Sequence, residues 1–307
     1  MMSRNISKTD TQLTHRKVTF DFSKTTLHWI PSDPFTSQFL SVIHTILPAG
    51  EFFFCRLYNK AKHDITDEKL LDDVNGFIRQ EATHARAHNT GTNDLLIKQG
   101  VDVQPYIDKI EWLFNELLSD TPLGYTLSKN AEKRWLIARL GLVAAIEHFT
   151  CVLGKYALEN TRWDEMNADP VILDILRWHA AEEIEHRSVA FDVYQHLSGN
   201  YLMRYLHMLI AATGIISLWA LGATDLMKQD PAFSAQKPKI LGRFFWSTWQ
   251  NRANKGRLPS IATLVVISFR YLHPSYNPAN EADTQQALDY LSNSPAAKQA
   301  ATAEIAA

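Results

Sequence analysis

Apolar residues recur along most of this chain at the three- and four-residue spacing of amphipathic helices. No stretch shows the alternation of apolar and polar residues that is typical of a β-strand. Prolines and glycines divide the helical pattern into segments. The pattern therefore predicts an all-α protein with helices over residues 35–47, about 48–60, 66–90, 104–118, 128–160 and 170–197, and three or four more beyond residue 200.

The same pattern predicts how the chain is organised. Residues 1–24 are polar and irregular, and we expect them to form a flexible arm. Residues 25–200 carry the long helices and would form the main helical bundle. Residues 201–293 would add C-terminal helices to this bundle, and the Ala-rich residues 294–307 would form a frayed tail.

One predicted helix contains no Asp, Glu, Lys or Arg over residues 205–224. About twenty apolar residues are what a membrane-spanning helix needs. The segment also holds polar and small residues, so we expect a buried central helix, with docking on a membrane surface as a second interpretation and a span as a third. A shorter apolar run, Ile261–Phe269, follows Arg252, Lys255 and Arg257, which would suit a membrane interface.

Composition and charge narrow the function classes. The chain is 46% hydrophobic and 21% charged, which is ordinary for a globular protein, and its formal net charge of −2 gives no support to a nucleic-acid partner. Its two cysteines, Cys55 and Cys151, are too few for a disulfide framework, and the N-terminus has no apolar run typical of a signal peptide. We expect a cytoplasmic protein, with membrane association through residues 205–224 left open.

The candidate chemistry begins in the helix predicted for residues 170–197. On a helix, His179, Glu183 and His186 form one stripe, with Glu182 at its edge and Glu185 turned away towards solvent. Two imidazoles and a carboxylate on one stripe can bind a transition-metal ion. The alternative is a solvated, charge-rich helix face, which is the usual meaning of such an acidic cluster.

Matching residues occur on three other predicted helices. Glu51 lies on one, Glu81 and His84 on the next, and Glu147 on a third, so the whole reads E…ExxH…E…ExxH. This is the ligand scheme of a four-helix bundle that holds two metal ions. ExxH alone is a weak signal, but each pair here is placed in mid-helix and follows a helix with its own glutamate. Four glutamates would neutralise two divalent ions in a buried site.

Carboxylate and imidazole ligands without thiolates favour iron, with manganese or a mixed pair as alternatives, over a structural zinc site. The four glutamates Glu51, Glu81, Glu147 and Glu183 would also be the catalytic residues. His179 has no counterpart in the first half, where Phe77 stands at the matching position. We expect it to be a seventh ligand, and a core histidine is the alternative.

The ligand order, with its extra histidine, resembles that of the ferritin-like arylamine N-oxygenases, which are di-iron enzymes. A broader likeness over residues 28–280 is to a bacterial family named predicted metal-dependent hydrolases; it rests on the segments PAGEFFF, QEATHARAHN, AAEEIEHRSVAFDVY and YLHPSYNP. In place of an expected aromatic, this chain has Ile46-Leu47 before PAGEFFF. The resemblance implies a ferritin-like bundle and metal binding by Glu51, Glu81, His84, Glu147, Glu183 and His186.

The leading interpretation is a di-iron oxidase or oxygenase that uses O2 to oxidise a small organic substrate of hydrophobic character, with an electron donor that the sequence does not identify. The first alternative is a metal-dependent hydrolase in which the metal pair generates hydroxide from water. The second is a metal-binding protein without catalysis. A homodimer is left open.

Three further residues carry two interpretations each. His88 shares the face of Glu81 and His84, and it could orient a ligand or be an interior histidine. Cys55 and Cys151 each follow a predicted ligand by four residues, and we expect them to be small buried apolar side chains rather than part of the site.

Overall fold

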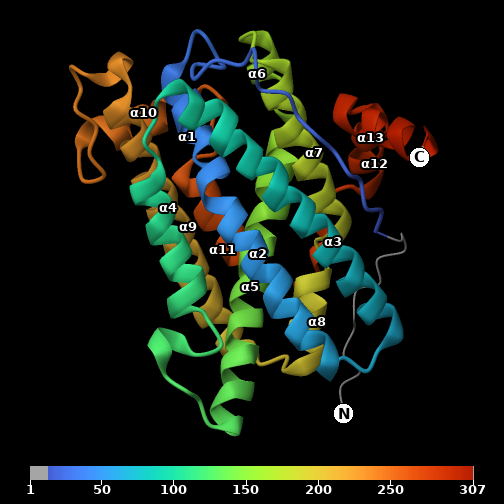
Figure 1. The fold of residues 1–307 in the computed structure, drawn as a ribbon. Helices are drawn as coiled ribbons and strands as arrows, with labels where there is room; N and C mark the ends of the chain where they lie inside the picture. Colours follow the sequence, from blue (N-terminus) through green and yellow to red (C-terminus); the bar gives the residue numbers. More distant parts are fainter. Residues whose placement is uncertain (1–12, 307) are drawn as a thin grey trace.

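The computed structural model describes residues 13–306, and every regular element in this range is a helix, which confirms the all-α prediction (Figure 1). The long helices of the first part are α2 (Ile43–Ala61), α3 (Glu68–Gly91), α5 (Lys129–Glu159) and α7 (Pro170–His186). Shorter helices connect them: α1 (Pro34–Ser41), α4 (Gln104–Trp112), α6 (Arg162–Glu165) and α8 (Val189–Leu197). The C-terminal part holds α9 (Tyr201–Gln229), α10 (Arg243–Asn254), α11 (Ile261–Tyr271), α12 (Thr284–Asn293) and α13 (Pro295–Ala306).

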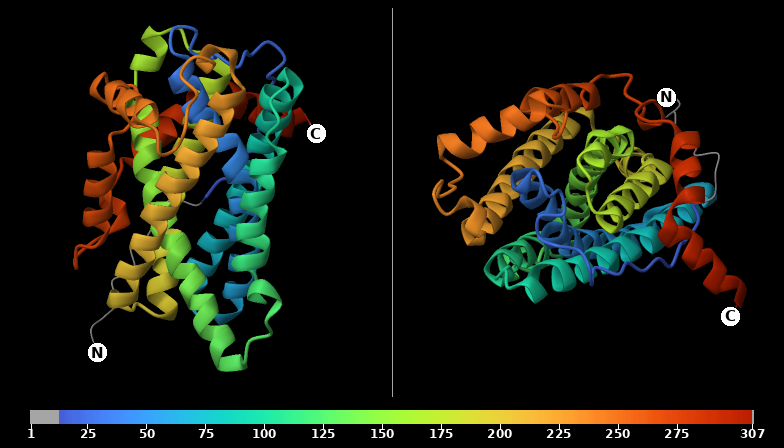
Figure 2. Two further views of the ribbon diagram at one scale, coloured as in Figure 1. Left: turned by 90° about the vertical axis from the view of Figure 1, so that its left-hand side faces the viewer. Right: turned by 90° about the horizontal axis from the view of Figure 1, so that it is seen from above.

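Four of the long helices form the centre of the molecule. Helix α2 packs on α3 and α5 packs on α7, while contacts between α2 and α5 and between α3 and α7 close the group. Helices α8 and α9 pack on α5, and α12 packs on α7. Seen from above, α9, α10 and α11 lie together on one side of this centre, and α12 and α13 lie on the opposite side (Figure 2).

Helix α2 runs through a proline. The predicted helix boundary at Pro48 is wrong, because the break falls near residue 42 and Pro48 lies inside α2. A proline leaves the carbonyl four residues earlier without its helical N–H donor. Here that carbonyl belongs to His44 and accepts a hydrogen bond from the Thr92 hydroxyl. Glu51 therefore lies on a continuous helix, in the middle of its length.

The predicted helix over residues 170–197 is two helices. Its start is as expected, because the Asp169 carboxylate caps α7 and Pro170 occupies the first turn, where a missing N–H has no cost. The chain breaks at Arg187 and Ser188 before α8 begins. The buried Arg187 guanidinium donates to the carbonyls of Ile184 and of Pro278, which lies on a distant segment.

Both ends of the described chain pack on the helices. Residues 13–24 have irregular backbone, and they bury Leu13, Val18 and Phe22 against the helical core. Residues 1–12 of the predicted flexible arm lie outside the described residues. At the other end, α13 occupies most of the predicted frayed tail, and its Ala296 and Ala297 are buried.

The prediction that residues 205–224 form a buried central helix is wrong. They belong to α9, which packs on α1 and α5 with one face only. The other face leaves large apolar side chains exposed, among them Leu206, Leu209 and Ile210. Sequence periodicity did not show this because the exposed and buried faces of α9 are both apolar.

We predict that the contact between α5 and α9 depends on Gly141. A Cβ at this position would overlap the buried His207 ring and lie 2.8 Å from the Tyr194 ring. Gly141→Ala should therefore lower the free energy of unfolding by about 1–3 kcal/mol, the usual cost of overpacking. Urea unfolding followed by circular dichroism measures this.

The matched control is Gly214→Ala on α9, where an added Cβ meets no atom within 4 Å. Alanine is a better helix former than glycine, so this variant should be more stable by up to about 1 kcal/mol. Equal stability of the two variants would contradict the close approach at Gly141.

Candidate metal centre

The four central helices bring the seven predicted ligands together. All seven side chains are buried. They form two adjacent groups, and within each group the candidate ligand atoms all lie within 4.8 Å of one another. The first group is Glu51 of α2, His84 of α3 and His179 of α7, and the second is Glu81 of α3, Glu147 of α5, and Glu183 and His186 of α7.

Two carboxylates lie between the groups. Glu183 Oε1 is 2.8 Å from His179 Nε2 and 3.6 Å from His84 Nδ1. Its other oxygen, Oε2, is 3.3 Å from His186 Nε2. Glu81 Oε1 is 3.9 Å from His84 Nδ1 and 3.2 Å from His186 Nε2. Each of these two carboxylates thus reaches imidazoles of both groups, whereas the other two glutamates each belong to one group.

Each ExxH histidine is oriented by a hydrogen bond at the imidazole nitrogen that faces away from the candidate metal ligands. His84 turns Nδ1 towards the carboxylates, and its Nε2 is 2.9 Å from Glu182 Oε2. His186 turns Nε2 inwards, and its Nδ1 is 3.0 Å from Gln80 Oε1. An outer acceptor holds the ring N–H on the outside and leaves the inner nitrogen free to bind a cation.

A buried network joins these outer acceptors. Arg16, from the N-terminal segment, donates to Glu182 at 2.9 Å and to Glu185 at 2.7 Å. Glu185 also accepts from the Gln80 amide at 3.0 Å. The prediction that Glu185 is solvated is wrong, since it is 2% exposed. Burial raises the pKa of Glu182 to about 7, although Arg16 opposes this shift.

Arg16 and Gln80 were missed by the sequence analysis. Glu182 and Glu185, three residues apart on one face of a buried helix, require a cationic partner. That requirement is a signal, but sequence spacing does not say which of the many Lys and Arg residues meets it. Gln80 directly precedes a predicted ligand, and its amide bonds identify its role only once α3 and α7 are seen side by side.

His179 is held by a chain of buried histidines. Its Nε2 is 2.8 Å from Glu183, and its Nδ1 is 2.7 Å from His88 Nε2. His88 Nδ1 is in turn 3.0 Å from His44 Nδ1. His88 therefore contacts the candidate ligand His179, which agrees with the interpretation that His88 orients a ligand.

The donor atoms fit a pair of cations. Several inward-facing ligand atoms are buried and have no hydrogen-bond partner: Glu51 Oε2, both oxygens of Glu81 and of Glu147, Glu183 Oε2, His84 Nδ1 and His186 Nε2. Burial first, and the neighbouring carboxylates second, raise the pKa of Glu51 and of Glu81 well above normal, and raise that of Glu147 to about 7. Carboxylates crowded in this way require positive charge between them.

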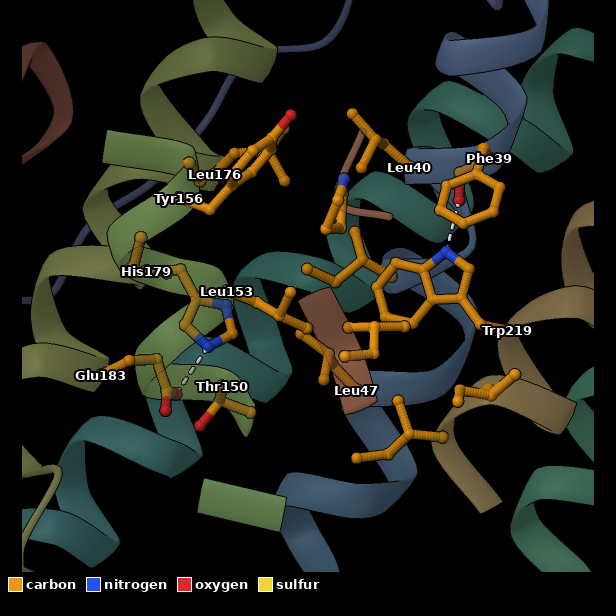
Figure 3. Close-up of a pocket in the computed structure, with 18 of the residues that line it drawn as sticks. Phe39, Leu40, Leu47, Thr150, Leu153, Tyr156, Leu176, His179, Glu183 and Trp219 are labelled. Atoms are coloured by element: carbon orange, nitrogen blue, oxygen red, sulfur yellow. Dashed lines mark hydrogen bonds and ion pairs between the residues drawn. The ribbon is translucent and has the colours of Figure 1, made fainter. Parts of the chain in front are cut away.

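An apolar cavity of about 150 Å³ opens beside the two groups (Figure 3). His179 and Glu183 lie on one wall, and Trp219 of α9 lies on the opposite side. Most of the remaining lining is aliphatic or aromatic, including Leu47 of α2 and Leu153 of α5. A substrate that reaches the candidate metal ligands through this cavity must present an apolar surface.

Three other residues, each close in sequence to a candidate ligand, lie outside the two groups. Cys55 and Cys151 are buried, and burial raises the pKa of each thiol to about 12, in keeping with small apolar side chains. His148 bonds the Tyr276 hydroxyl and the Ile267 carbonyl, both in the C-terminal part of the chain.

Comparison with known proteins places the chain in a family. The family model described as "Predicted metal-dependent hydrolase" matches residues 14–282, so the chain belongs to this family. The comparisons with curated proteins and with solved structures gave no match. Membership shows a metal-dependent protein, and the description favours the hydrolase alternative over the oxygenase interpretation.

The positions of the glutamates predict different metal contents for two variants. Glu183→Ala removes a carboxylate that reaches both groups and should leave almost no bound metal. Glu147→Ala removes a carboxylate of one group and should leave about one ion of the two. Mass spectrometry of the purified, metal-loaded variants measures this.

Glu159→Ala, at the exposed C-terminal end of α5, is the matched control and should keep both ions. Loss of both ions from Glu147→Ala would show that Glu147 also bridges, which would contradict its assignment to one group.

Gln80→Leu tests the outer hydrogen bonds. The substitution keeps the volume but removes the acceptor for His186 and the donor to Glu185. Metal affinity should fall about 10- to 100-fold, as is usual when a ligand loses its orienting partner. Competition with a chelator measures the affinity, and Gln285→Leu on the exposed side of α12 serves as the control. Unchanged affinity of Gln80→Leu would show that the network does not orient the ligand.

Proposed function

We propose that this protein is a dinuclear metal enzyme with a ferritin-like four-helix bundle formed by α2, α3, α5 and α7. The observation that carries the proposal is the donor set: one glutamate from each of α2 and α5, and an ExxH pair from each of α3 and α7, with their inward atoms unpartnered. This is the arrangement of di-iron and di-manganese carboxylate proteins. Carboxylate and imidazole ligands without thiolates favour iron or manganese over zinc as the resident metal.

The reaction that this donor set favours is oxidation of an organic substrate by dioxygen. Iron bound here would supply electrons to dioxygen. Insertion of one oxygen atom into a substrate bond, with water as the second product, takes two electrons from the substrate, and two electrons and two protons that come ultimately from an external donor. By analogy with other two-metal proteins, helical ExxH pairs suit this chemistry better than hydrolysis, where the sites are usually richer in Asp and His on loops.

The residues of the chain have separate tasks in this proposal. Glu81 and Glu183 would hold both cations, and Glu51 and Glu147 would each hold one. His179, fixed between Glu183 and the ring of His88, stands at the cavity and makes the two positions inequivalent.

The cavity wall would bind and orient the substrate. Its apolar lining, with Leu153 of α5 and Trp219 of α9 on facing sides, excludes water from the space next to Glu183 (Figure 3). An apolar substrate gains free energy by leaving water for this cavity. Its reactive position would lie at the wall formed by His179 and Glu183.

Hydrolysis is the second candidate, and the description of the family supports it. The two metal positions would then activate water, and the cavity would hold the apolar part of an ester or amide. The residues that bind metal and substrate would be the same in both reactions. The two candidates differ in what is consumed, dioxygen or water, and this makes them separable.

The deciding experiment gives the protein Fe(II) under argon and then admits dioxygen in an oxygen electrode. Fast oxygen consumption that depends on bound iron, and that is lost in Glu183→Ala, supports the oxidase reaction. In parallel, the zinc- and manganese-loaded protein is mixed under argon with nitrophenyl esters of different chain length.

Metal-dependent ester cleavage without any oxygen consumption would overturn the oxidase proposal and establish the hydrolase. The Glu159→Ala protein should behave as the wild type in both assays. If the protein holds two metal ions but shows neither oxygen consumption nor ester cleavage, both candidate reactions are contradicted. Metal binding without catalysis would then be the function that remains.

A further inference from the structure

The outer face of α9 is apolar over most of its length. Its exposed positions include Leu202, Leu206, Leu209 and Ile210, and the part of the helix from residue 205 to 224 has no charged residue. A water-exposed helix face normally carries charges. An uncharged, apolar outer face is typical of a surface that is covered by another apolar body.

Helix α11 continues this surface, since it packs on α9. Val265, Val266 and Phe269 are exposed, and Phe269 is 69% exposed. No charge interrupts α11 before Arg270 in its last turn. We call the exposed residues of these two helices the apolar face: Leu202, Leu206, Leu209, Ile210, Val265, Val266 and Phe269.

Positive charge is concentrated in the segment that links these helices. Residues 231–260 contain six Lys and Arg and no Asp or Glu, although the whole chain has a net charge of −2. Arg252 and Arg257 are paired with the buried Asp33. Lys237, Lys239, Arg243 and Lys255 are exposed in the loops around α10 and at the start of this helix.

Another apolar residue stands among these charges. Leu241 lies between Lys239 and Arg243 and is 95% exposed. An apolar side chain flanked by basic residues is the arrangement found where proteins contact anionic lipid. Figure 2 shows that α9, α10 and α11 share one side of the molecule, so the basic loops and the apolar face lie on the same side.

The inner sides of the same helices line the cavity. Ile215, Ile216 and Trp219 of α9, and Leu264 of α11, belong to its wall. The cavity that reaches His179 and Glu183 is therefore bounded by the two helices whose outer sides are apolar and uncharged. Helices α9 and α11 thus have the apolar face on one side and the cavity on the other.

We propose that this side of the molecule docks on an anionic lipid bilayer, and that the substrate is a long-chain aliphatic molecule taken from that bilayer into the cavity. The second part rests on the proposed function, because it assigns the substrate class to the same site. The basic loops would attract the lipid headgroups, and the apolar face would enter the boundary between headgroups and acyl chains.

Charge argues against a second copy of the chain as the occupant. A symmetric contact through the apolar face would bring two strongly basic segments together, and like charges oppose such a contact.

Helix packing around the candidate site argues against a membrane span. Three segments, Pro34–Asp64, Lys129–Glu159 and Tyr201–Gln229, are long and apolar enough to cross a membrane by length and composition. The first two carry Glu51 and Glu147, whose helices pack with α3 and α7 around the candidate site, and the third packs on Lys129–Glu159.

The test uses the full, metal-loaded chain and vesicle flotation with phosphatidylcholine alone or mixed with phosphatidylglycerol. The wild type should bind the mixed vesicles, bind phosphatidylcholine weakly, and lose binding as salt rises. The double variant Leu209→Glu/Phe269→Glu should bind the mixed vesicles about tenfold more weakly or worse, because it places two charges in the apolar face. Both positions are exposed, so these changes should leave folding intact.

Ile97→Glu/Tyr125→Glu is the matched control. It adds the same two charges at exposed apolar positions elsewhere on the molecule and should bind like the wild type. Lys239→Glu/Arg243→Glu should remove the dependence on phosphatidylglycerol. Equal vesicle binding by wild type and Leu209→Glu/Phe269→Glu, or no binding by the wild type at low salt, would overturn the docking surface.

Two further results would show that the apolar face has another role, either as a contact with a second copy of the chain or as part of a membrane span. A wild-type dimer in light scattering that becomes a monomer in Leu209→Glu/Phe269→Glu, without vesicle binding, would assign the face to a second copy. Resistance to extraction from membranes at high pH would assign a span. Either result would overturn the proposal.

The substrate class is tested by binding, without turnover. A fluorescent long-chain fatty acid should bind the wild type and the Leu209→Glu/Phe269→Glu protein equally well in solution, and should bind about tenfold more weakly to Leu153→Trp, which fills the cavity. Failure of the probe to bind the wild type would overturn the substrate class. Metal content and oxygen consumption, measured on the same proteins, report separately on the proposed function.

Discussion

The structure depends on the burial of four carboxylates among apolar helices. Glu51, Glu81, Glu147 and Glu183 are all buried, and burial together with mutual repulsion makes such a cluster unfavourable without cations. The imidazoles between them offset part of this cost. Two divalent ions would neutralise it, and this need explains why four helices from separate parts of the chain converge on one point.

A second set of buried polar residues surrounds this cluster and is satisfied by hydrogen bonds. Arg16 forms ion pairs with Glu182 and Glu185, and Gln80 connects Glu185 to the second ExxH histidine. The N-terminal segment therefore contributes to the site, because it supplies the only arginine that the described hydrogen bonds place on these two carboxylates. The apolar cavity lies at His179 and Glu183. The hydrogen bonds that orient the candidate ligands are therefore on a different side of the site from the cavity.

The helices, and the grouping of the seven candidate ligands on four of them, could be predicted from the sequence because both follow the period of the helix. Local rules failed where a distant residue decides the outcome. The hydroxyl of Thr92 allows α2 to continue through Pro48, and Arg16 explains why Glu185 can be buried. The spacing of apolar residues also does not predict that one face of segment 205–224 is exposed, because both faces of this helix are apolar. The reaction itself depends on which metal binds, and neither spacing nor geometry determines this.

The central claim is that two metal ions lie side by side in this cluster. Anomalous diffraction from crystals of the iron-loaded protein, collected on both sides of the iron edge, tests it directly. We expect two peaks, one beside Glu51, His84 and His179 and one beside Glu147 and His186, with Glu81 and Glu183 next to both. A single peak, or peaks outside these residues, would contradict a dinuclear site.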